Sequence, residues 1–289
     1  MLHLRLLLGT VLIALVVLFC WLDARATTPL TYLLPLAILL SVAASAELVA
    51  LFKSAGLRPI GPLVCAGNAA IVASNGIGLI WLGRRDEPPL ERLAWPLLAL
   101  AVCVLAALVG EMRRYQKPGG VTVNLAAAMF AFVYVGLLFS FLAQLRALPP
   151  ASFGIALLAA TVATVKLADI GAYTVGRLIG RHKMAPVLSP GKTIEGAAGA
   201  LVFASLGAYL VFSWLAPQAP WRAIAFGLIV GTAGIAGDLA ESLLKRDLGQ
   251  KDSSHWVPGF GGVLDVLDSV LFAAPVAYLC VLCGLVIGQ

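Results

Sequence analysis

Long apolar runs, separated by short polar connections, make up most of the chain. A helix needs roughly 20 apolar residues to cross a hydrocarbon core of about 30 Å. Nine runs meet this requirement, at about residues 5–22, 30–51, 60–82, 94–112, 122–144, 152–169, 196–215, 221–240 and 263–287. Because helices satisfy their own backbone hydrogen bonds within lipid, the pattern predicts an all-α fold, a polytopic membrane helix bundle of about nine transmembrane helices.

Composition supports the same fold class. Of the 289 residues, 61% are hydrophobic and only 12% are charged, which excludes an ordinary soluble domain. The run at 5–22 follows Arg5 and has the apolar core of a signal peptide, yet no convincing small-residue cleavage site follows Asp23. We therefore expect this run to be retained, with cleavage as the alternative. All five cysteines lie within or at the end of apolar runs, so no disulfide framework is expected.

Lysine and arginine residues are divided unequally between the two faces of the predicted bundle. The N-terminus and the even-numbered connections carry thirteen of them, against six on the opposite side. By the positive-inside rule, the N-terminus is cytoplasmic and the C-terminus lies outside, in a multi-pass protein of the inner (cytoplasmic) cell membrane. The net charge of +6 then reflects this bias and contacts with anionic lipid or phosphate, and no nucleic-acid partner is expected.

Polarity also divides the chain into two parts. Residues 1–148 have short connections with ordinary flanking charges, and we expect them to form N-terminal scaffold helices. Glu47 is an acid within an apolar run, and we expect it to be a structural residue partnered by nearby Lys53. After Pro149 and Pro150 the polar positions multiply, so residues 149–289 are expected to form a catalytic membrane domain with a polar site that faces the cytoplasm.

The most polar stretch covers residues 237–269, with six of the fourteen acidic residues and three of the twenty basic ones. Four of its side chains fall at helical positions i, i+3, i+4 and i+7 and so share one face: Asp238, Glu241, Ser242 and Lys245. After a bend rich in proline and glycine, Asp265 and Asp268 repeat the i, i+3 spacing. Two carboxylate-bearing helix faces joined by a short loop can converge on one hard cation.

A second polar segment begins at Lys166, which shares a helical face with Asp169 and Tyr173. Five cationic or titratable residues follow within sixteen positions: Arg177, Arg181, His182, Lys183 and Lys192. The sequence Ser189-Pro-Gly-Lys192-Thr193 then leads into a predicted helix, whose first N–H groups, positive dipole end and lysine ammonium suit a phosphate. Phosphate binding is the favoured interpretation and a plain helix cap the alternative, because the earlier glycine of a Walker motif is missing.

Carboxylates at helical spacing beside a cluster of cations suit a polyphosphate that carries Mg²⁺. The residues therefore favour an enzyme of phosphoryl or nucleotidyl transfer to a lipid. An ion-coupled membrane transporter is the competing class, since charges near helix ends can line an ion path. The charges gather at one face and no inverted repeat is visible, which argues against a transporter. The three histidines lie far apart in the sequence and predict no zinc site.

The polar stretch carries a long pattern with fixed gaps. Its parts are Ser242-Leu-Leu-Lys245-Arg246, Lys251-Asp252, and Pro258-Gly-Phe-Gly-Gly-Val-Leu-Asp265-Val-Leu-Asp268. This pattern closely resembles the signature of the phosphatidate cytidylyltransferase (CDP-diglyceride synthase) family, S-x-x-K-R-x-x-x-x-K-D followed by P-G-H-G-G-x-x-D-R-x-D. The segments around Asp169 and Lys192 are similar to that family too, so the resemblance covers about residues 160–289.

The resemblance implies transfer of CMP from CTP to phosphatidic acid, giving CDP-diacylglycerol and pyrophosphate in phospholipid biosynthesis. It implies Mg²⁺ as cofactor, with a second, monovalent cation and a homodimer left open. Physical role and resemblance both select Asp238 and Asp265 as the metal ligands. The expected catalytic residues are Asp238, Lys245, Arg246, Asp252, Asp265 and Asp268. The expected substrate-binding residues are Asp169, Ser189, Lys192, Thr193, Glu195, Ser242, Lys251 and His255.

Two positions depart from the family's pattern. Phe260 stands where the family has the histidine of P-G-H-G-G, and Val266 stands where it has the arginine of D-R-x-D. Any phosphate contact of those two polar groups is absent here, and His255 and Arg246 are nearby candidates to replace it. A catalytically altered relative with a scaffold role is therefore a further hypothesis, although most of the signature is intact.

Overall fold

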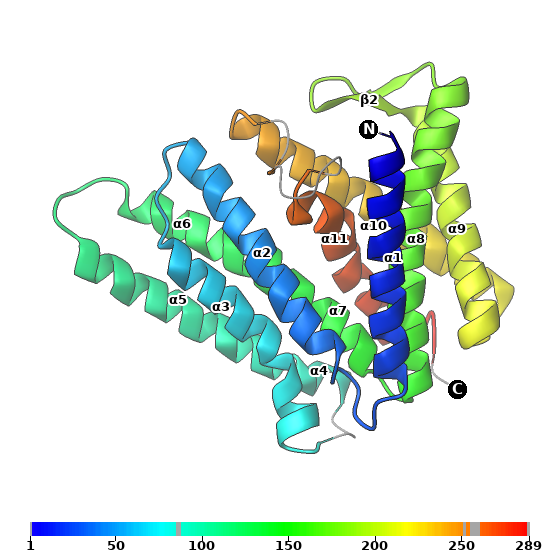
Figure 1. The fold of residues 1–289 in the computed structure, drawn as a ribbon, viewed down its shortest axis with the longest axis horizontal. Helices are drawn as coiled ribbons and strands as arrows, with labels where there is room; N and C mark the ends of the chain where they lie inside the picture. Colours follow the sequence, from blue (N-terminus) through cyan, green and yellow to red (C-terminus); the bar gives the residue numbers. More distant parts are fainter. Residues whose placement is uncertain (1, 85–87, 251–252, 255–260, 288–289) are drawn as a thin grey trace. The chain divides into compact units, whose positions relative to one another are not determined.

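The computed structural model describes residues 2–84, 88–250, 253–254 and 261–287, and Figure 1 shows their helices. The chain divides into two compact units. Unit 1 consists of Met1–Ala147 and Asp247–Val266, and unit 2 of Leu148–Arg246 and Leu267–Gln289. Each unit is therefore built from two separate stretches of sequence. The division into scaffold and catalytic parts at residue 148 concerns function and stays a prediction.

Unit 1 is formed by the N-terminal helices and by the start of α11. Its elements are α1 (Leu2–Ala24), α2 (Leu33–Ser54), α3 (Gly61–Ala73), the π-helix η1 (Ile77–Trp81), α4 (Pro89–Arg92), α5 (Ala94–Arg114), α6 (Val121–Ala131), the π-helix η2 (Phe132–Leu137) and α7 (Leu138–Ala147). Helices α2, α3 and η2 pack around fully buried apolar side chains, among them Leu48, Ile71 and Phe132. These apolar contacts form the core of the unit.

Buried amide side chains add interhelical hydrogen bonds to this core. Asn68 Nδ2 donates to Ser45 Oγ over 2.7 Å, and Asn75 Nδ2 donates to Ser140 Oγ over 2.9 Å. Gln144 Nε2 donates to Asn75 Oδ1 over 2.7 Å. Because water is absent from a bilayer core, such bonds hold membrane helices together.

A buried ion pair ties the end of α7 to the end of α1. Arg146 Nε donates to Asp23 Oδ2 over 2.7 Å, and Arg146 Nη2 donates to the Asp23 carbonyl over 2.9 Å. The Asp23 carboxylate also accepts the backbone N–H groups of Leu30, Tyr32 and Leu33. The first turn of α2 thereby gains an acceptor for N–H groups that have no partner within the helix.

Unit 2 combines long helices with one small sheet. Its elements are α8 (Ala151–Ile179), β1 (Lys183–Ala185), β2 (Ser189–Thr193), α9 (Ile194–Leu215), α10 (Pro220–Asp247) up to Arg246, and α11 (Val263–Leu282) from Leu267 on. Strands β1 and β2 pair antiparallel, with Lys183 opposite Thr193 and Ala185 opposite Ser189. The sequence analysis did not predict this hairpin.

The helices confirm the predicted fold class, an all-α membrane bundle apart from the short hairpin. Seven helical segments among the described residues are long and apolar enough to cross a membrane: Leu33–Ser54, Pro89–Arg114, Val121–Ala147, Ala151–Ile179, Ile194–Leu215, Pro220–Asp247 and Val263–Leu282. Gly9–Ala24 and Gly61–Ala73 form shorter apolar helices. Each of the nine predicted runs is thus mainly helical, but the number of nine crossings is not confirmed. The chain is a multi-pass membrane protein.

Candidate active site

Most of the predicted site residues lie in unit 2. These are Asp169, Ser189, Lys192, Thr193, Glu195, Asp238, Ser242, Lys245, Arg246 and Asp268. Asp265 belongs to unit 1. The predicted residues Lys251, Asp252 and His255 lie outside the described residues, as does Phe260.

An ion pair joins the two polar segments that the sequence analysis selected separately. Lys192 Nζ, at the end of β2, lies 2.6 Å from Asp238 Oδ2 on α10. Both side chains are partly exposed, but the Lys192 Nζ atom itself is buried, so the Asp238 carboxylate is the more accessible partner. The hairpin is what delivers Lys192 to this place, because β1 and β2 hold the chain extended until α9 begins. The phosphate-binding hypothesis for Lys192 and the carboxylate hypothesis for Asp238 therefore concern one location.

Asp268 lies on α11 and is close enough to Asp238 for the two carboxylates to repel each other. Its Oδ1 accepts the backbone N–H of Ser269 over 2.5 Å and the Ser269 hydroxyl over 3.0 Å. Gly237 explains how the helices that carry the two acids come together, because a Cβ there would lie only 2.6 Å from Phe272 Cβ and 3.1 Å from the Asp268 carbonyl. Because glycine has no side chain, α10 and α11 can approach closely near Asp238 and Asp268.

A third carboxylate belongs to the same cluster. Asp169 on α8 interacts electrostatically with Asp238, Lys166 and Lys192, and its Oδ2 lies 3.5 Å from Lys166 Nζ. Lys166 also acts on Asp268. Three carboxylates and two lysines from α8, β2, α10 and α11 therefore form one charged group, which we call the acidic cluster: Lys166, Asp169, Lys192, Asp238 and Asp268.

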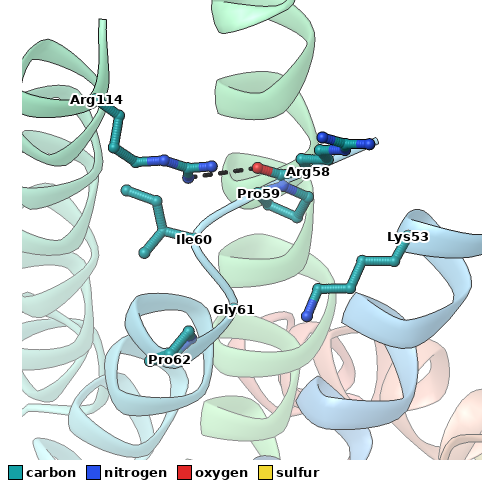
Figure 2. A pocket seen from close by; sticks show the side chains of 7 residues that line it. All are labelled: Lys53, Arg58, Pro59, Ile60, Gly61, Pro62 and Arg114. Atoms are coloured by element: carbon teal, nitrogen blue, oxygen red, sulfur yellow. Dashed lines mark hydrogen bonds between the residues drawn. The ribbon is translucent and has the colours of Figure 1, made fainter. Parts of the chain in front are cut away.

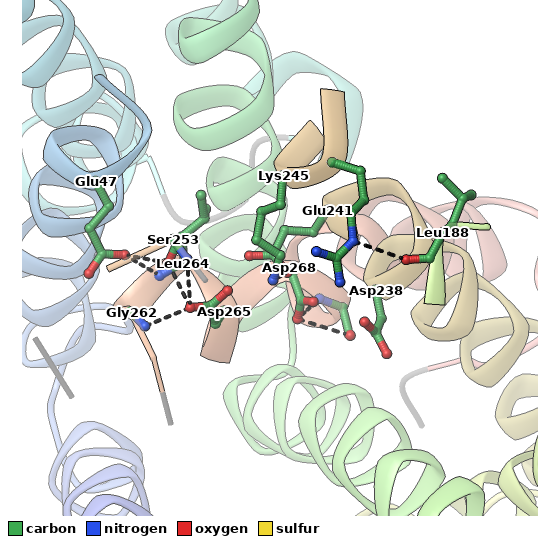
Figure 3. A network of polar contacts seen from close by, with 12 residues as sticks. Glu47, Leu188, Asp238, Glu241, Lys245, Ser253, Gly262, Leu264, Asp265 and Asp268 are labelled. Atoms are coloured by element: carbon green, nitrogen blue, oxygen red, sulfur yellow. Dashed lines mark hydrogen bonds and ion pairs between the residues drawn. The ribbon is translucent and has the colours of Figure 1, made fainter. Parts of the chain in front are cut away.

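The remaining polar residues of α10 are arranged differently from the prediction. Lys245 Nζ donates to Glu241 Oε2 over 2.6 Å, and Glu241 is buried. Arg246 Nε lies 3.5 Å from the Leu188 carbonyl, at the turn of the hairpin. Ser242 is half-buried on the same helix. The lysine and arginine that were predicted to meet a phosphate thus already have protein partners. Figure 3 shows Lys245 and Glu241 together.

Two predicted substrate-binding residues stabilise the start of α9. Thr193 is the N-cap residue, and its Oγ1 accepts the Gly196 N–H over 3.1 Å. Glu195 accepts the backbone N–H of Arg181 over 3.0 Å, and its Oε1 lies 2.6 Å from His182 Nδ1. Ser189 lies at the start of β2. These contacts agree with the plain-cap alternative for Thr193, and substrate binding by the three residues stays a prediction.

In unit 1, Asp265 holds the chain just before α11. Its Oδ2 accepts the Gly262 N–H over 2.7 Å, the Ser253 N–H over 3.2 Å and the Ser253 hydroxyl over 2.7 Å. A Cβ on Gly262 would overlap both Glu47 Oε2 and Ser253 Oγ, so this position of the signature requires glycine. One oxygen of the predicted metal ligand Asp265 is therefore occupied by protein donors.

Glu47 is a structural residue, as the sequence predicted, but its partners are not the expected one. Its Oε1 accepts the Ser254 hydroxyl over 2.7 Å and the Val263 N–H over 2.9 Å. Its Oε2 accepts the Leu264 N–H over 2.8 Å and the Ser253 hydroxyl over 3.4 Å (Figure 3). The expected partnership with Lys53 is wrong, because Glu47 instead caps the N-terminus of α11, where a negative charge is favoured by the helix dipole. The one signal was an acid within an apolar run.

The donor set suits a hard divalent cation. Among the described residues, no group of three or more His, Cys, Asp or Glu side chains is arranged to hold a metal ion. Mg²⁺ is commonly bound through only one or two carboxylates, with substrate phosphates and water completing the shell. Asp238 and Asp268 fit this requirement, since their mutual repulsion is relieved by a cation. The predicted ligand pair, Asp238 and Asp265, combines residues of both units and stays a prediction.

Comparison with known proteins identifies the class to which this arrangement belongs. A model of the cytidylyltransferase family matches residues 3–283, nearly the whole chain. The chain therefore belongs to the cytidylyltransferase family and is a nucleotidyltransferase. This result confirms the enzyme class that the residues and the resemblance predicted, and it disfavours the transporter.

Several relatives carry more specific names. The phosphatidate cytidylyltransferase of Mycobacterium bovis is 32% identical over 243 residues, which are 83% of this chain and 76% of the relative. The phosphatidate cytidylyltransferase of Staphylococcus aureus (strain COL) is 31% identical over 233 residues, 80% of this chain and 85% of the relative. The uncharacterized protein YnbB of Escherichia coli (strain K12) is 34% identical over 163 residues, but the match spans only 55% of its length. The predicted family resemblance is thereby confirmed.

Proposed function

We propose that the protein is a phosphatidate cytidylyltransferase, which transfers CMP from CTP to phosphatidic acid in the synthesis of CDP-diacylglycerol. Family membership supports the nucleotidyl transfer, and the names of the relatives from Mycobacterium bovis and Staphylococcus aureus support the lipid acceptor. The observation that carries the proposal is the acidic cluster, where Lys192 meets Asp238 beside Asp268. Its carboxylates and ammonium groups are the groups that a metal-bound triphosphate requires.

In the proposed reaction an oxygen of the phosphatidate phosphate attacks the α-phosphorus of CTP. The bond from that phosphorus to the oxygen that bridges to the β-phosphorus breaks, and pyrophosphate leaves. When bound, Mg²⁺ supplies charge neutralisation for the triphosphate and its leaving group, and Asp238 and Asp265 are the residues proposed to hold it. A second, monovalent cation remains part of the hypothesis.

The chain's own residues supply position and charge. Lys192 compensates the Asp238 carboxylate and offers its ammonium to a phosphoryl oxygen at the same place. Lys166 acts in the same way beside Asp169 and Asp268. The nucleophile is a phosphate that is already ionised near neutral pH, so no general base is required.

The N-terminus is proposed to be cytoplasmic, in the inner membrane, so that CTP reaches the acidic cluster from the cytoplasm. A homodimer is also proposed, on the basis of the family resemblance.

The proposal is tested by pyrophosphate release from the purified protein in detergent with Mg²⁺, CTP and phosphatidate. We expect release that requires the lipid and that is abolished in Asp238→Asn. Asp247→Asn is the matched control, because Asp247 is an exposed acid at the end of the same helix and should leave release unchanged. Folded protein that releases no pyrophosphate with CTP or any other nucleotide would contradict the proposal and favour the scaffold hypothesis.

A further inference from the structure

Unit 1 contains a basic cavity that shares no residue with the acidic cluster. The cavity has a volume of about 520 Å³ and lies between the end of α2, the start of α3 and the end of α5. Three cations line it: Lys53, Arg58 and Arg114 (Figure 2). Its volume falls within the roughly 300–1,000 Å³ that small-molecule sites commonly have.

The charge of this cavity is poorly compensated by the protein. Arg114 Nη1 lies 3.2 Å from Glu111 Oε1 and 3.5 Å from the Arg58 carbonyl. The side chains of Lys53 and Arg58 form no ion pair with any residue that the structure describes. Three cations therefore face one buried carboxylate, so the cavity favours an anion. Glu111 itself does not line the cavity, and among the residues that the structure describes no carboxylate does so to bind the ammonium group of a zwitterionic lipid.

An apolar groove adjoins the basic cavity. It has a volume of about 540 Å³, and Ile60 lines both spaces. Its walls come from Leu63 on α3 and from a helical stripe on α5 formed by Val102, Leu105, Ala106 and Val109, and Arg113 of α5 also lines it. Gly110 makes room for Ile60, because a Cβ there would lie 2.6 Å from Ile60 Cδ1. The cations of the basic cavity thus adjoin a largely apolar groove that runs along α3 and α5.

We propose that this combined site binds one anionic glycerophospholipid, with its phosphate among Lys53, Arg58 and Arg114 and an acyl chain in the groove of α3 and α5. Basic pockets beside membrane helices attract anionic head groups, and the apolar groove distinguishes a lipid from a free phosphate. Neither half alone specifies a ligand, whereas the charged head and apolar tail of one lipid match the two adjoining halves. The inference does not depend on the proposed catalytic function.

The experiment measures binding of phosphatidylglycerol to the full-length detergent-purified protein by native mass spectrometry, without CTP. We expect one retained phosphatidylglycerol, with phosphatidylcholine binding more weakly. A cation near an anionic head group contributes about 1 kcal/mol, or about fivefold in affinity. Lys53→Gln combined with Arg58→Gln should therefore weaken binding about 25-fold, while Lys117→Gln, at an exposed lysine outside the cavity, should not change it.

A second variant tests the groove without altering any charge. Ala106→Phe fills the space for the acyl chain and should lower the affinity, whereas Leu108→Phe, on a part of α5 that does not line the groove, should not. Glycerol 3-phosphate should fail to compete, because it lacks an acyl chain. Equal binding of phosphatidylcholine, equal losses in the variants and their controls, or competition by glycerol 3-phosphate would each overturn the proposal.

Discussion

The two units use their charged side chains in different ways. In unit 1, Asp23, Glu47 and Arg146 are at most 2% exposed, and every one of them is bonded to the protein. In unit 2, the side chains of Lys192 and Asp238 remain 23% and 37% exposed although they lie 2.6 Å apart. Buried charges of the first kind hold helices in place, whereas the exposed carboxylate of Asp238 is able to meet a ligand; the Lys192 Nζ atom beside it is itself buried. Side-chain exposure therefore distinguishes Asp238 from these three structural charges of unit 1.

Unit 2 also contains exceptions that sharpen this contrast. Glu241 is buried and bonded to Lys245, and Asp268 is buried and bonded to Ser269. The first pair resembles the charges of unit 1, and we expect it to be structural. Asp268 keeps its place in the acidic cluster because Asp238 and Lys166 act on it directly.

The largest loss of stability is expected from Arg146→Met. This change leaves the Asp23 carboxylate buried without its cation, and breaking a buried ion pair costs about 3–5 kcal/mol. A large fall in the thermal unfolding midpoint of the detergent-purified protein should result. Asp23→Asn combined with Arg146→Met should recover part of the loss, since no buried charge is then left. A midpoint close to that of the wild type would show that this pair is not structural.

Glu47→Gln should have the next largest effect. An amide has one acceptor oxygen, so some of the four donors that Glu47 now satisfies lose their partner, at about 1–3 kcal/mol for each unsatisfied group. Because the donors flank the start of α11, pyrophosphate release per folded molecule should fall as well. Ser254→Ala removes one of these contacts and serves as the milder comparison. Unchanged release by folded Glu47→Gln would limit Glu47 to a purely structural role.

Gly237→Ala should cost about 1–3 kcal/mol, because the added Cβ would meet Phe272 and push α10 away from α11. Gly234→Ala is the matched control on the same helix, since its Cβ would lie 3.4 Å from Val165, which is an ordinary contact. Thermal unfolding and pyrophosphate release are measured for both. Similar behaviour of the two variants would argue against close approach at Gly237 as the feature that places Asp238 beside Asp268.

Lys192→Gln should have the smallest effect on stability and yet a large effect on turnover. A partly exposed ion pair contributes about 0–1 kcal/mol to folding. Removing a group that stabilises charge in the transition state commonly costs on the order of 100-fold in rate. Lys183→Gln, at the exposed first residue of strand β1 in the same hairpin, should leave the rate of pyrophosphate release unchanged. Equal rates for the two variants would remove Lys192 from the proposed site.

The sequence predicted the features that arise from local pattern. Apolar runs located the helices, and the i, i+3 spacing correctly placed Asp238 and Glu241 on one helix and Asp265 and Asp268 on another. The run at 60–82 became the short helix α3 and the π-helix η1, a break that the uniform apolar pattern does not reveal.

Contacts between residues far apart in the sequence could not be predicted from the local sequence pattern. The partners of Glu47 lie 206–217 residues further along the chain, whereas the expected partner Lys53 was chosen for its nearness in sequence. The contact of Lys192 with Asp238 likewise depends on the β1–β2 hairpin, whose short strands carry no clear period-two pattern. Spacing identified the reactive residue types in both cases, but only the fold shows which of them are already bonded.

The cap that Glu47 provides also imposes an order on biosynthesis. Helix α2 is complete long before Leu264 is translated, since 217 residues separate Glu47 from this partner. At about 5–20 residues per second, the ribosome needs roughly 10–40 s to cover that distance. During this interval the carboxylate lacks the N–H groups and hydroxyls that later surround it. Until the start of α11 arrives, the Glu47 side chain must therefore stay hydrated, be held by other polar groups or take up a proton.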